Sequence, residues 1–124
     1  MGLFSKKTSE SKKSINWTEL TSIAQLEDAI SLSKEKPVML FKHSTRCSIS
    51  SMALNRVEGD WNFSEEEITP FYLDLIAHRD ISAAIADKLN VFHASPQMIV
   101  VKNEKSVLDA SHNSINTRII KEVI

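Results

Sequence analysis

The sequence predicts one α/β domain in which a mixed sheet of four to five strands has helices on both faces. Two observations predict this class. Apolar runs typical of buried strands alternate with segments whose apolar residues recur at helical spacing, in the order β-α-β-α-β-α-β-β-α. A helix between two strands favours a parallel pair, whereas the last two strands are close enough in sequence to form an antiparallel hairpin. The length of 124 residues suits a single domain.

The chain begins its predicted fold with an edge strand and a helix. A short apolar stretch over about 15–20 is interpreted as the strand. Ser22 followed by Gln25 is a capping-box pattern, in which two side chains satisfy backbone N–H groups at a helix start. Apolar residues then recur at helical spacing, so we expect a helix over about 22–34, which Pro37 ends.

The next predicted pair is a buried strand and a second helix. The compact apolar run over 38–41 has breakers on both sides and predicts the strand. A helix is predicted over about 47–58, and its core face is predicted to hold Ile49, Met52, Ala53 and Val57. Gly59 suits the position just after the end of such a helix.

The second half of the chain predicts five elements. They are a strand over 68–76, a helix over 81–90, strands over 97–102 and 106–110, and a C-terminal helix over 115–123. Pro70 fits only near the start of its strand, because proline cannot donate a hydrogen bond to the sheet. The last two strands are separated by a short turn and are predicted to form a hairpin.

Composition excludes several function classes. Fifteen Lys and Arg against sixteen Asp and Glu give a net charge of −1, so we expect no nucleic-acid partner. Gly2 and Gly59 are the only glycines, which excludes the glycine-rich loops of common nucleotide-binding folds. Cys47 is the only cysteine, which excludes a disulfide framework and cysteine-rich zinc sites. We therefore expect neither a metal nor a nucleotide cofactor.

The first fourteen residues differ in composition from the rest. They are polar and lysine-rich, so we predict a flexible tail over 1–14 and a folded domain over 15–124. This start lacks the apolar segment of a signal peptide, and no stretch approaches the roughly 18 apolar residues of a membrane span. Together with the single cysteine, these features predict a cytoplasmic protein without a membrane span.

Cys47 is the residue with the clearest chemical potential, because it lies between a buried strand and a helix. Unpaired N–H groups and the helix dipole place positive charge at a helix start and stabilise a thiolate there. Arg46 adds a fixed charge, and Ser50 could donate a hydrogen bond to the sulfur. The alternative is a buried, inert cysteine, since free cysteines are often buried. The polar neighbours favour the reactive thiol.

Ser95-Pro96, directly before an apolar strand, is the second feature. A bond that precedes proline tolerates the cis form far better than any other, and the resulting tight turn can present backbone groups to a ligand. An ordinary trans proline at a strand start is the alternative. His43 and His93 lie near these features in sequence; we interpret them as surface or strand-end residues that could also tune the thiol.

Taken together, these segments resemble the thioredoxin superfamily over residues 15–124. Within it, FKHSTRCSIS and ASPQMIVVKN are similar to the monothiol bacilliredoxins of the BrxC family, whose motif is Thr-Cys-Pro-Ile-Ser. Cys47, Ile49 and Ser50 align with the motif, Ser48 replaces its proline, and Arg46 stands between the threonine and the cysteine. The resemblance implies a three-layer thioredoxin-like fold, a cis Pro96, and a Ser95-Pro96 turn that faces Cys47.

The resemblance also implies the reaction. A lone cysteine can form a mixed disulfide but cannot resolve it internally, because the position of a second cysteine holds Ser50. We therefore expect removal of bacillithiol from S-bacillithiolated proteins through Cys47, with bacillithiol as co-substrate and a possible partner reductase. The residues expected to bind the small thiol are Thr45, Arg46, Ser50, Ser95 and Pro96.

Two other functions stay open at this stage. The domain could be a thioredoxin-like binding or adaptor module without turnover, since fold alone does not fix function. It could instead share an iron–sulfur cluster between two chains, although the Cys-Gly-Phe-Ser motif typical of such proteins is absent.

Overall fold

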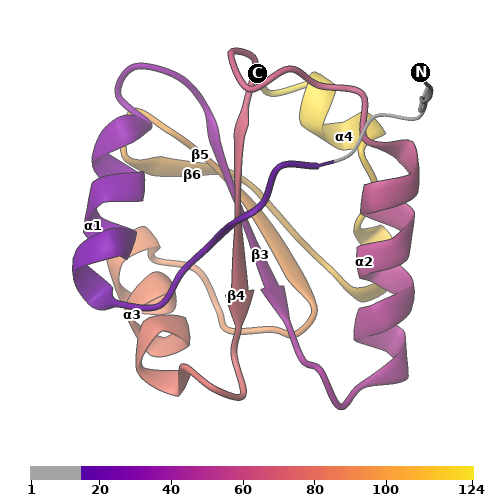
Figure 1. Cartoon of the computed structure of the whole chain (residues 1–124). Coiled ribbons are helices and arrows are strands. Elements are labelled where there is room, and N and C mark those ends of the chain that lie inside the picture. The colour runs from indigo at the N-terminus through magenta and orange to yellow at the C-terminus, as the bar shows by residue number, and fades with distance from the viewer. Residues whose placement is uncertain (1–14) are drawn as a thin grey trace, which may run out of the picture.

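The computed structural model describes residues 15–124, and the tail predicted over 1–14 lies outside these residues. The elements follow in the order β2 (Thr18–Glu19), α1 (Ile23–Leu32), β3 (Val38–His43), α2 (Ser48–Asp60), β4 (Thr69–Asp74), α3 (Arg79–Leu89), β5 (Gln97–Lys102), β6 (Lys105–Ser111), the 3₁₀ turn η2 (His112–Ser114) and α4 (Arg118–Lys121). Helices α1 and α3 cover one face of the sheet, and α2 and α4 cover the other (Figure 1). The predicted mixed sheet with helices on both faces is confirmed.

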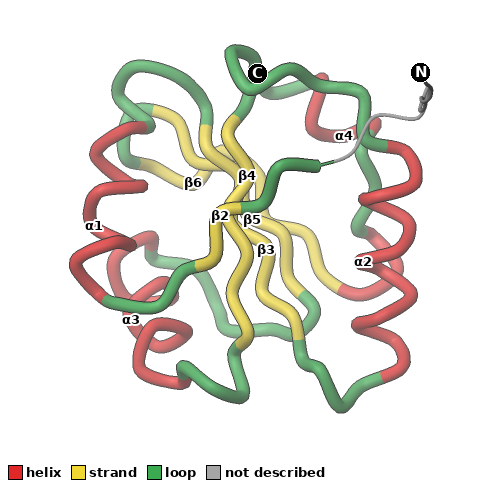
Figure 2. The backbone as a smooth tube through the Cα atoms, viewed as in Figure 1, coloured by secondary structure: helices red, strands yellow, loops and turns green. Residues whose placement is uncertain are grey.

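The sheet has five strands in the order β2-β4-β3-β5-β6, and they run through the middle of the molecule in Figure 2. β4 pairs parallel with both β2 and β3, whereas β5 pairs antiparallel with β3 and β6. His43 lies opposite Asp74, and Lys42 lies opposite Gln97. The ends of β3 and β4 and the start of β5 therefore meet at one edge, which we call the carboxyl edge.

Each face of β3 buries its side chains in a separate core. Val38 and Leu40 pack toward α1 and α3, while Met39 and Phe41 pack toward α2 and α4. Alternation along a strand produces this division, and each fully buried side chain of this size stabilises the fold by about 1.5–3 kcal/mol. Every residue of β3 is buried, so the strand forms a rigid base for the loop that follows it.

Helix ends and turns follow their predicted chemistry. The Gln25 N–H donates to Ser22 Oγ at 3.1 Å, which confirms the predicted Ser22 cap, whereas Gln25 Oε1 accepts from the N–H of Thr21, one residue before the cap, at 2.8 Å. Asn90 ends α3 in the left-handed conformation, with φ 56°. Asn103 and Glu104 turn the β5–β6 hairpin, also with positive φ, as a two-residue hairpin loop requires.

The core face of α2 is only partly the one predicted, because Ala53 and Val57 are buried as expected whereas Ile49 and Met52 are not. Ile49 is 49% exposed and Met52 is 61% exposed, so the prediction that they carry the core face is wrong. The buried face is formed by Ser50, Ala53 and Val57. A polar serine can occupy it because its hydroxyl has buried partners, which are described below. The helix also continues to Asp60, so Gly59 lies within it rather than after it.

The C-terminal segment is less helical than its apolar spacing predicts. Instead of one helix over 115–123, it forms η2 and the short α4, separated by extended backbone at Ile115. Asn116 Oδ1 accepts from the Arg118 N–H at 3.0 Å, which favours a new helix start at that point. Ile115 and Ile120 are still fully buried. The helical spacing therefore identified core residues of this segment correctly, although it did not predict where the helices begin and end.

None of the helices within residues 15–124 is long and apolar enough to cross a membrane.

Candidate active site at the start of α2

Cys47 occupies the N-cap position of α2, where the chain leaves the carboxyl edge. Its backbone is extended, and its carbonyl accepts a helical hydrogen bond from the Ser51 N–H at 3.1 Å. No side chain of the described residues caps this helix start, so the positive end of the helix faces the region of the thiol. Cys47 is partly exposed. A reacting disulfide can therefore reach the side chain of the residue at which this helix starts.

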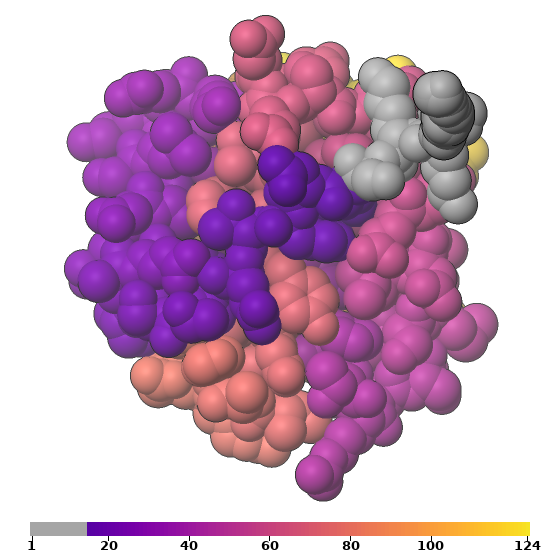
Figure 3. Space-filling model, viewed as in Figure 1, coloured from indigo at the N-terminus to yellow at the C-terminus, as the bar shows by residue number. Residues whose placement is uncertain are grey.

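Thr45 and Arg46 lie in the same loop and are exposed. The segment between β3 and α2 protrudes at the bottom of the molecule beyond α3, where solvent surrounds it on several sides (Figure 3). The structure thus brings two of the predicted binding residues beside the thiol. The guanidinium of Arg46 is placed where it can meet an anionic group on an incoming molecule.

Ser50 has a different role from the one predicted. Its side chain is fully buried, and its Oγ lies 2.7 Å from His43 Nδ1 and accepts from the Ser44 N–H at 3.0 Å. The prediction that this hydroxyl donates to the Cys47 sulfur is wrong, because its hydrogen-bonding groups are directed at β3 and the loop. Ser50 instead ties the first turn of α2 to the strand that precedes Cys47.

Burial also sets the charge of His43. Desolvation lowers the pKa of its imidazole, although Asp74 and Glu58 act in the opposite direction. The ring is therefore neutral at neutral pH and can accept the Ser50 hydroxyl hydrogen at Nδ1. It also packs against the Tyr72 ring, with centroids 5.8 Å apart. His43 is an internal support of the site and not a surface residue.

The Ser95–Pro96 peptide bond is cis, the isomer that the resemblance implies. Since Gln97 pairs with Lys42, this bond lies beside the end of β3 and thus on the same edge as the Cys47 loop. Pro96 is buried, and its carbonyl accepts from the His112 N–H at 3.3 Å. The Ser95 Oγ is a buried atom without a hydrogen-bond partner among the described residues.

Gln97 holds the loop that leads to this cis bond. Its Nε2 donates to the Phe92 carbonyl at 2.9 Å, and its Oε1 accepts from the Ala94 N–H at 3.3 Å. The same Nε2 donates to Asp109 Oδ1 on β6 at 2.7 Å. These bonds fix a loop whose apolar tip, Phe92, is 94% exposed. Together with Ile49 and Met52 on α2, Phe92 gives the molecule exposed apolar side chains that the fold itself does not use.

Sequence reasoning missed a buried lysine at the same edge. Lys42 is fully buried, and its Nζ lies 2.7 Å from His93 Nδ1, which also lies 3.2 Å from Ser82 Oγ. Burial lowers the pKa of Lys42 to about 8, against the attraction of Asp109. The strand alternation could have indicated this burial, because Lys42 follows Val38 and Leu40 at every second position and its side chain must face the same core.

Among the described residues, no three His, Cys, Asp or Glu side chains gather as a group that could hold a metal ion. Two of the four histidines, His43 and His93, have the protein partners described above. The chemical group that stands out at this edge is therefore the thiol of Cys47.

Comparison with known proteins agrees with this geometry. A family model described as monothiol bacilliredoxin BrxC matches residues 18–120. A solved structure described as an oxidoreductase with a thioredoxin fold is 33% identical, with a TM-score of 0.73 over 86% of this chain and 92% of that one. A thioredoxin from Malassezia sympodialis is 13% identical, with a TM-score of 0.67 and coverage of 95% and 96%.

Thioredoxin O2 from Arabidopsis thaliana is also similar in structure. It is 20% identical, with a TM-score of 0.64 over 86% of this chain and 90% of that one. The two thioredoxins show the fold alone, since their sequences are distant. The predicted thioredoxin-like fold is confirmed by these neighbours.

Proposed function

The chain belongs to the monothiol bacilliredoxin BrxC family, and from this membership we propose that it removes bacillithiol from S-bacillithiolated proteins through Cys47. A redox role for the thiol follows from the family. What we propose beyond this role is the substrate, an S-bacillithiolated protein, and the direction of the reaction, which is removal of bacillithiol. The observation that supports it most is the place of the lone cysteine: partly exposed, at an uncapped helix start, on the edge that holds the cis Ser95–Pro96 bond.

The reaction has two exchange steps. The Cys47 thiolate attacks the bacillithiol sulfur of the mixed disulfide, a new sulfur–sulfur bond forms, and the substrate protein leaves as a thiolate. A second bacillithiol thiolate then attacks the bacillithiol sulfur on Cys47, which frees the Cys47 thiolate and produces bacillithiol disulfide. Each step breaks one disulfide and forms one, so electrons balance. A partner reductase could replace the second bacillithiol.

The reaction stops at a mixed disulfide because the chain has no second cysteine to resolve it. Ser50 occupies the position where a dithiol protein has its resolving cysteine, and its hydroxyl is buried against His43. An internal disulfide cannot form, so an outside thiol must complete the cycle. This favours a small-thiol substrate over the reduction of an internal protein disulfide.

The surroundings of Cys47 suit both halves of this substrate. The exposed Thr45 and Arg46 can bind the polar and carboxylate groups of bacillithiol, and the backbone at Ser95–Pro96 can bind an extended segment. Exposed Ile49, Met52 and Phe92 offer apolar contacts for the protein that carries bacillithiol. We expect this reaction to take place in the cytoplasm, with bacillithiol as co-substrate.

The proposal is tested by incubating the folded chain with bacillithiol disulfide and measuring its intact mass. We expect one bacillithiol adduct, located at Cys47 by peptide mapping and absent from Cys47→Ser. An unmodified folded chain would overturn the proposal.

A second measurement separates this enzyme from a binding module. Alkylation of Cys47 at neutral pH is compared between the folded chain and the chain unfolded in urea. A reactive site requires faster alkylation of the folded chain, because only the folded helix provides the positive environment. Slower alkylation of the folded chain would favour a binding module without turnover.

A further inference from the structure

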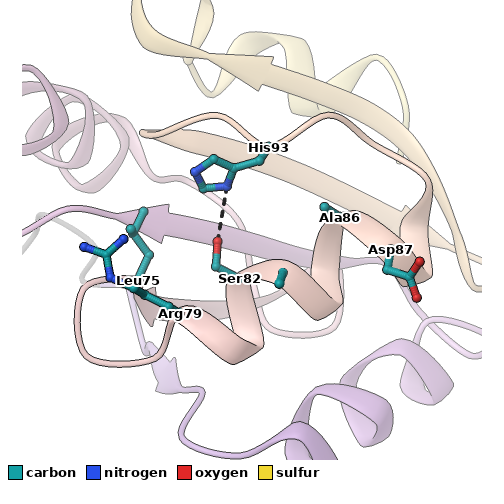
Figure 4. A pocket seen from close by; sticks show the side chains of 7 residues that line it. Leu75, Arg79, Ser82, Ala86, Asp87 and His93 are labelled. Atoms are coloured by element: carbon teal, nitrogen blue, oxygen red, sulfur yellow. Dashed lines mark hydrogen bonds between the residues drawn. The ribbon is translucent and has the colours of Figure 1, made fainter.

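A cavity of about 560 Å³ lies along α3, on the opposite face of the sheet from α2. One side of α3 forms its wall, from Arg79 through Ser82 and Ala86 to Asp87, while Leu75 and His93 complete it (Figure 4). These helical positions follow a spacing of three and four residues, so they share one face. The cavity thus has an apolar middle and a charged residue at each end.

The cavity belongs to the same edge as Cys47. The Leu75 N–H donates to the His43 carbonyl at 3.1 Å, which joins the cavity wall to the end of β3. His93 lies two residues before the cis Ser95–Pro96 bond, in the loop that Gln97 holds. A molecule in the cavity therefore lies against the loop that reaches the thiol site.

Lys42 determines which nitrogen of His93 can donate into the cavity. A lysine ammonium only donates, so the 2.7 Å contact requires His93 Nδ1 to act as an acceptor. A neutral imidazole with an accepting Nδ1 carries its hydrogen on Nε2. Burial and the charges of Lys42 and Arg79 lower the pKa of His93, which keeps the ring neutral.

The Nε2–H of His93 is directed toward the Arg79 end of the cavity. In Figure 4, Nδ1 is the nitrogen joined to Ser82, and the other ring nitrogen is on the side nearer Arg79. Arg79 itself is exposed and forms no ion pair with any residue in 15–124. An open guanidinium and an imidazole N–H at one end of a cavity are suitable donors for a carboxylate.

From this geometry we infer that the cavity binds a carboxylate of the low-molecular-weight thiol at Arg79 and His93, while Arg46 meets another anionic group of the same molecule nearer the reacting sulfur. The inference rests on the proposed function and names the place where its small substrate is held. Asp87 at the other end matches an amino group on the same molecule, whereas a purely anionic ligand would be repelled there. The small side chains of Ala83 and Ala86 between the two charged ends accommodate the uncharged body of the molecule.

The test uses S-methylated bacillithiol, which cannot exchange, as a probe of binding to the full chain by isothermal titration calorimetry. We expect Arg79→Gln to weaken binding about tenfold, since a hydrogen bond to a charged group is lost. Arg79→Lys should recover part of the loss. Arg118→Gln, an exposed arginine on α4 across the sheet, is the matched control and should bind as the wild type does.

Three results would overturn the inference. They are no binding to the wild-type chain, equal affinities of Arg79→Gln and Arg118→Gln, or binding of an acidic peptide in place of the probe.

Adduct formation at Cys47 with bacillithiol disulfide is followed in the same variants. If Arg79→Gln forms the adduct with an unchanged KM, the cavity assignment fails while the proposed function stands. If no variant forms the adduct but the probe binds through Arg79, the proposed function fails and the cavity assignment stands.

Discussion

His43 Nδ1 lies 2.7 Å from Ser50 Oγ, and this pair joins the end of β3 to the first turn of α2 across the loop that holds Cys47. The same Oγ accepts from the Ser44 N–H, so one buried hydroxyl fixes both sides of the loop. The position of the thiol is thus determined by contacts behind it. The exposed side of the loop, with Thr45 and Arg46, stays free for a substrate.

Ser50→Ala tests this support. The change leaves the Ser44 N–H and His43 Nδ1 without their buried partner, which costs about 1–3 kcal/mol of unfolding free energy. Urea unfolding followed by fluorescence measures it. Ser48→Ala is the control, because Ser48 is exposed two residues earlier and should change stability by less than about 0.5 kcal/mol. Equal effects of the two changes would contradict the role given to Ser50.

Ser48→Pro tests the position where the family motif has proline. Ser48 is the first residue of α2, a position at which proline is favoured because its N–H is not needed. We expect stability to rise by about 0.4–1 kcal/mol, since proline restricts the unfolded chain. Thermal unfolding and the rate of adduct formation are measured together.

Ser51→Pro is the contrasting variant. It removes the N–H that donates to the Cys47 carbonyl and should cost about 3 kcal/mol of unfolding free energy. A stabilised Ser51→Pro would contradict the assignment of the helix start to Cys47.

Lys42 gives stability a pH dependence with a defined sign. Its pKa is lowered from 10.5 to about 8 in the folded chain. Below pH 8 both states hold the proton, whereas between pH 8 and 10.5 only the unfolded state does, so stability rises with pH through this window. We expect a gain of roughly 2–3 kcal/mol by pH 10 relative to Lys42→Met, measured by urea unfolding.

The comparison with Lys42→Met at each pH is needed because Tyr72 acts in the opposite direction. Its pKa is raised by burial and by Asp74, Glu19 and Glu58, so its contribution to stability is lost as pH rises above its ordinary value of 10. Both proteins share that loss. Parallel pH profiles of wild type and Lys42→Met would show that Lys42 is not desolvated.

The exposed apolar residues are predicted to serve the protein substrate and not the fold. Met52→Ser and Phe92→Ser should each change stability by less than about 0.5 kcal/mol, because both side chains are largely exposed. They should raise the KM for a bacillithiolated protein without changing that for bacillithiol disulfide. Val107→Ser, an exposed apolar residue on β6, is the control. Equal KM values for all three variants would show that Met52 and Phe92 do not contact the protein substrate.

The sequence was sufficient for the fold class and for the place of the thiol, because both depend on local patterns. Alternating strands and helices predict the mixed sheet, and a cysteine between an apolar strand and a helical pattern predicts its place at the helix start. Ser22 and Gln25 likewise identified their cap, since the two side chains interact across a single turn. The cis state of Pro96 was implied by the family resemblance alone.

The parts that were missed depend on contacts across the sheet. Ile49 and Met52 fit a helical core face together with Ala53 and Val57, and only the partner of Ser50 on β3 shows that the buried face includes Ser50 instead of them. The pairing of Lys42 with His93 joins residues 51 positions apart, so no local pattern indicates it. The cavity beside α3 could not be predicted for the same reason, because His93 and Arg79 meet only in the folded chain.

The most direct test of the central claim follows bacillithiol from a substrate protein to this chain. A bacillithiolated model protein is mixed with the folded chain under exclusion of other thiols, and the masses of both proteins are recorded over time. The account predicts that the substrate loses one bacillithiol for each one gained at Cys47, and that Cys47→Ser abolishes the transfer. A substrate that keeps its bacillithiol, or loses it equally fast with Cys47→Ser, would contradict the account.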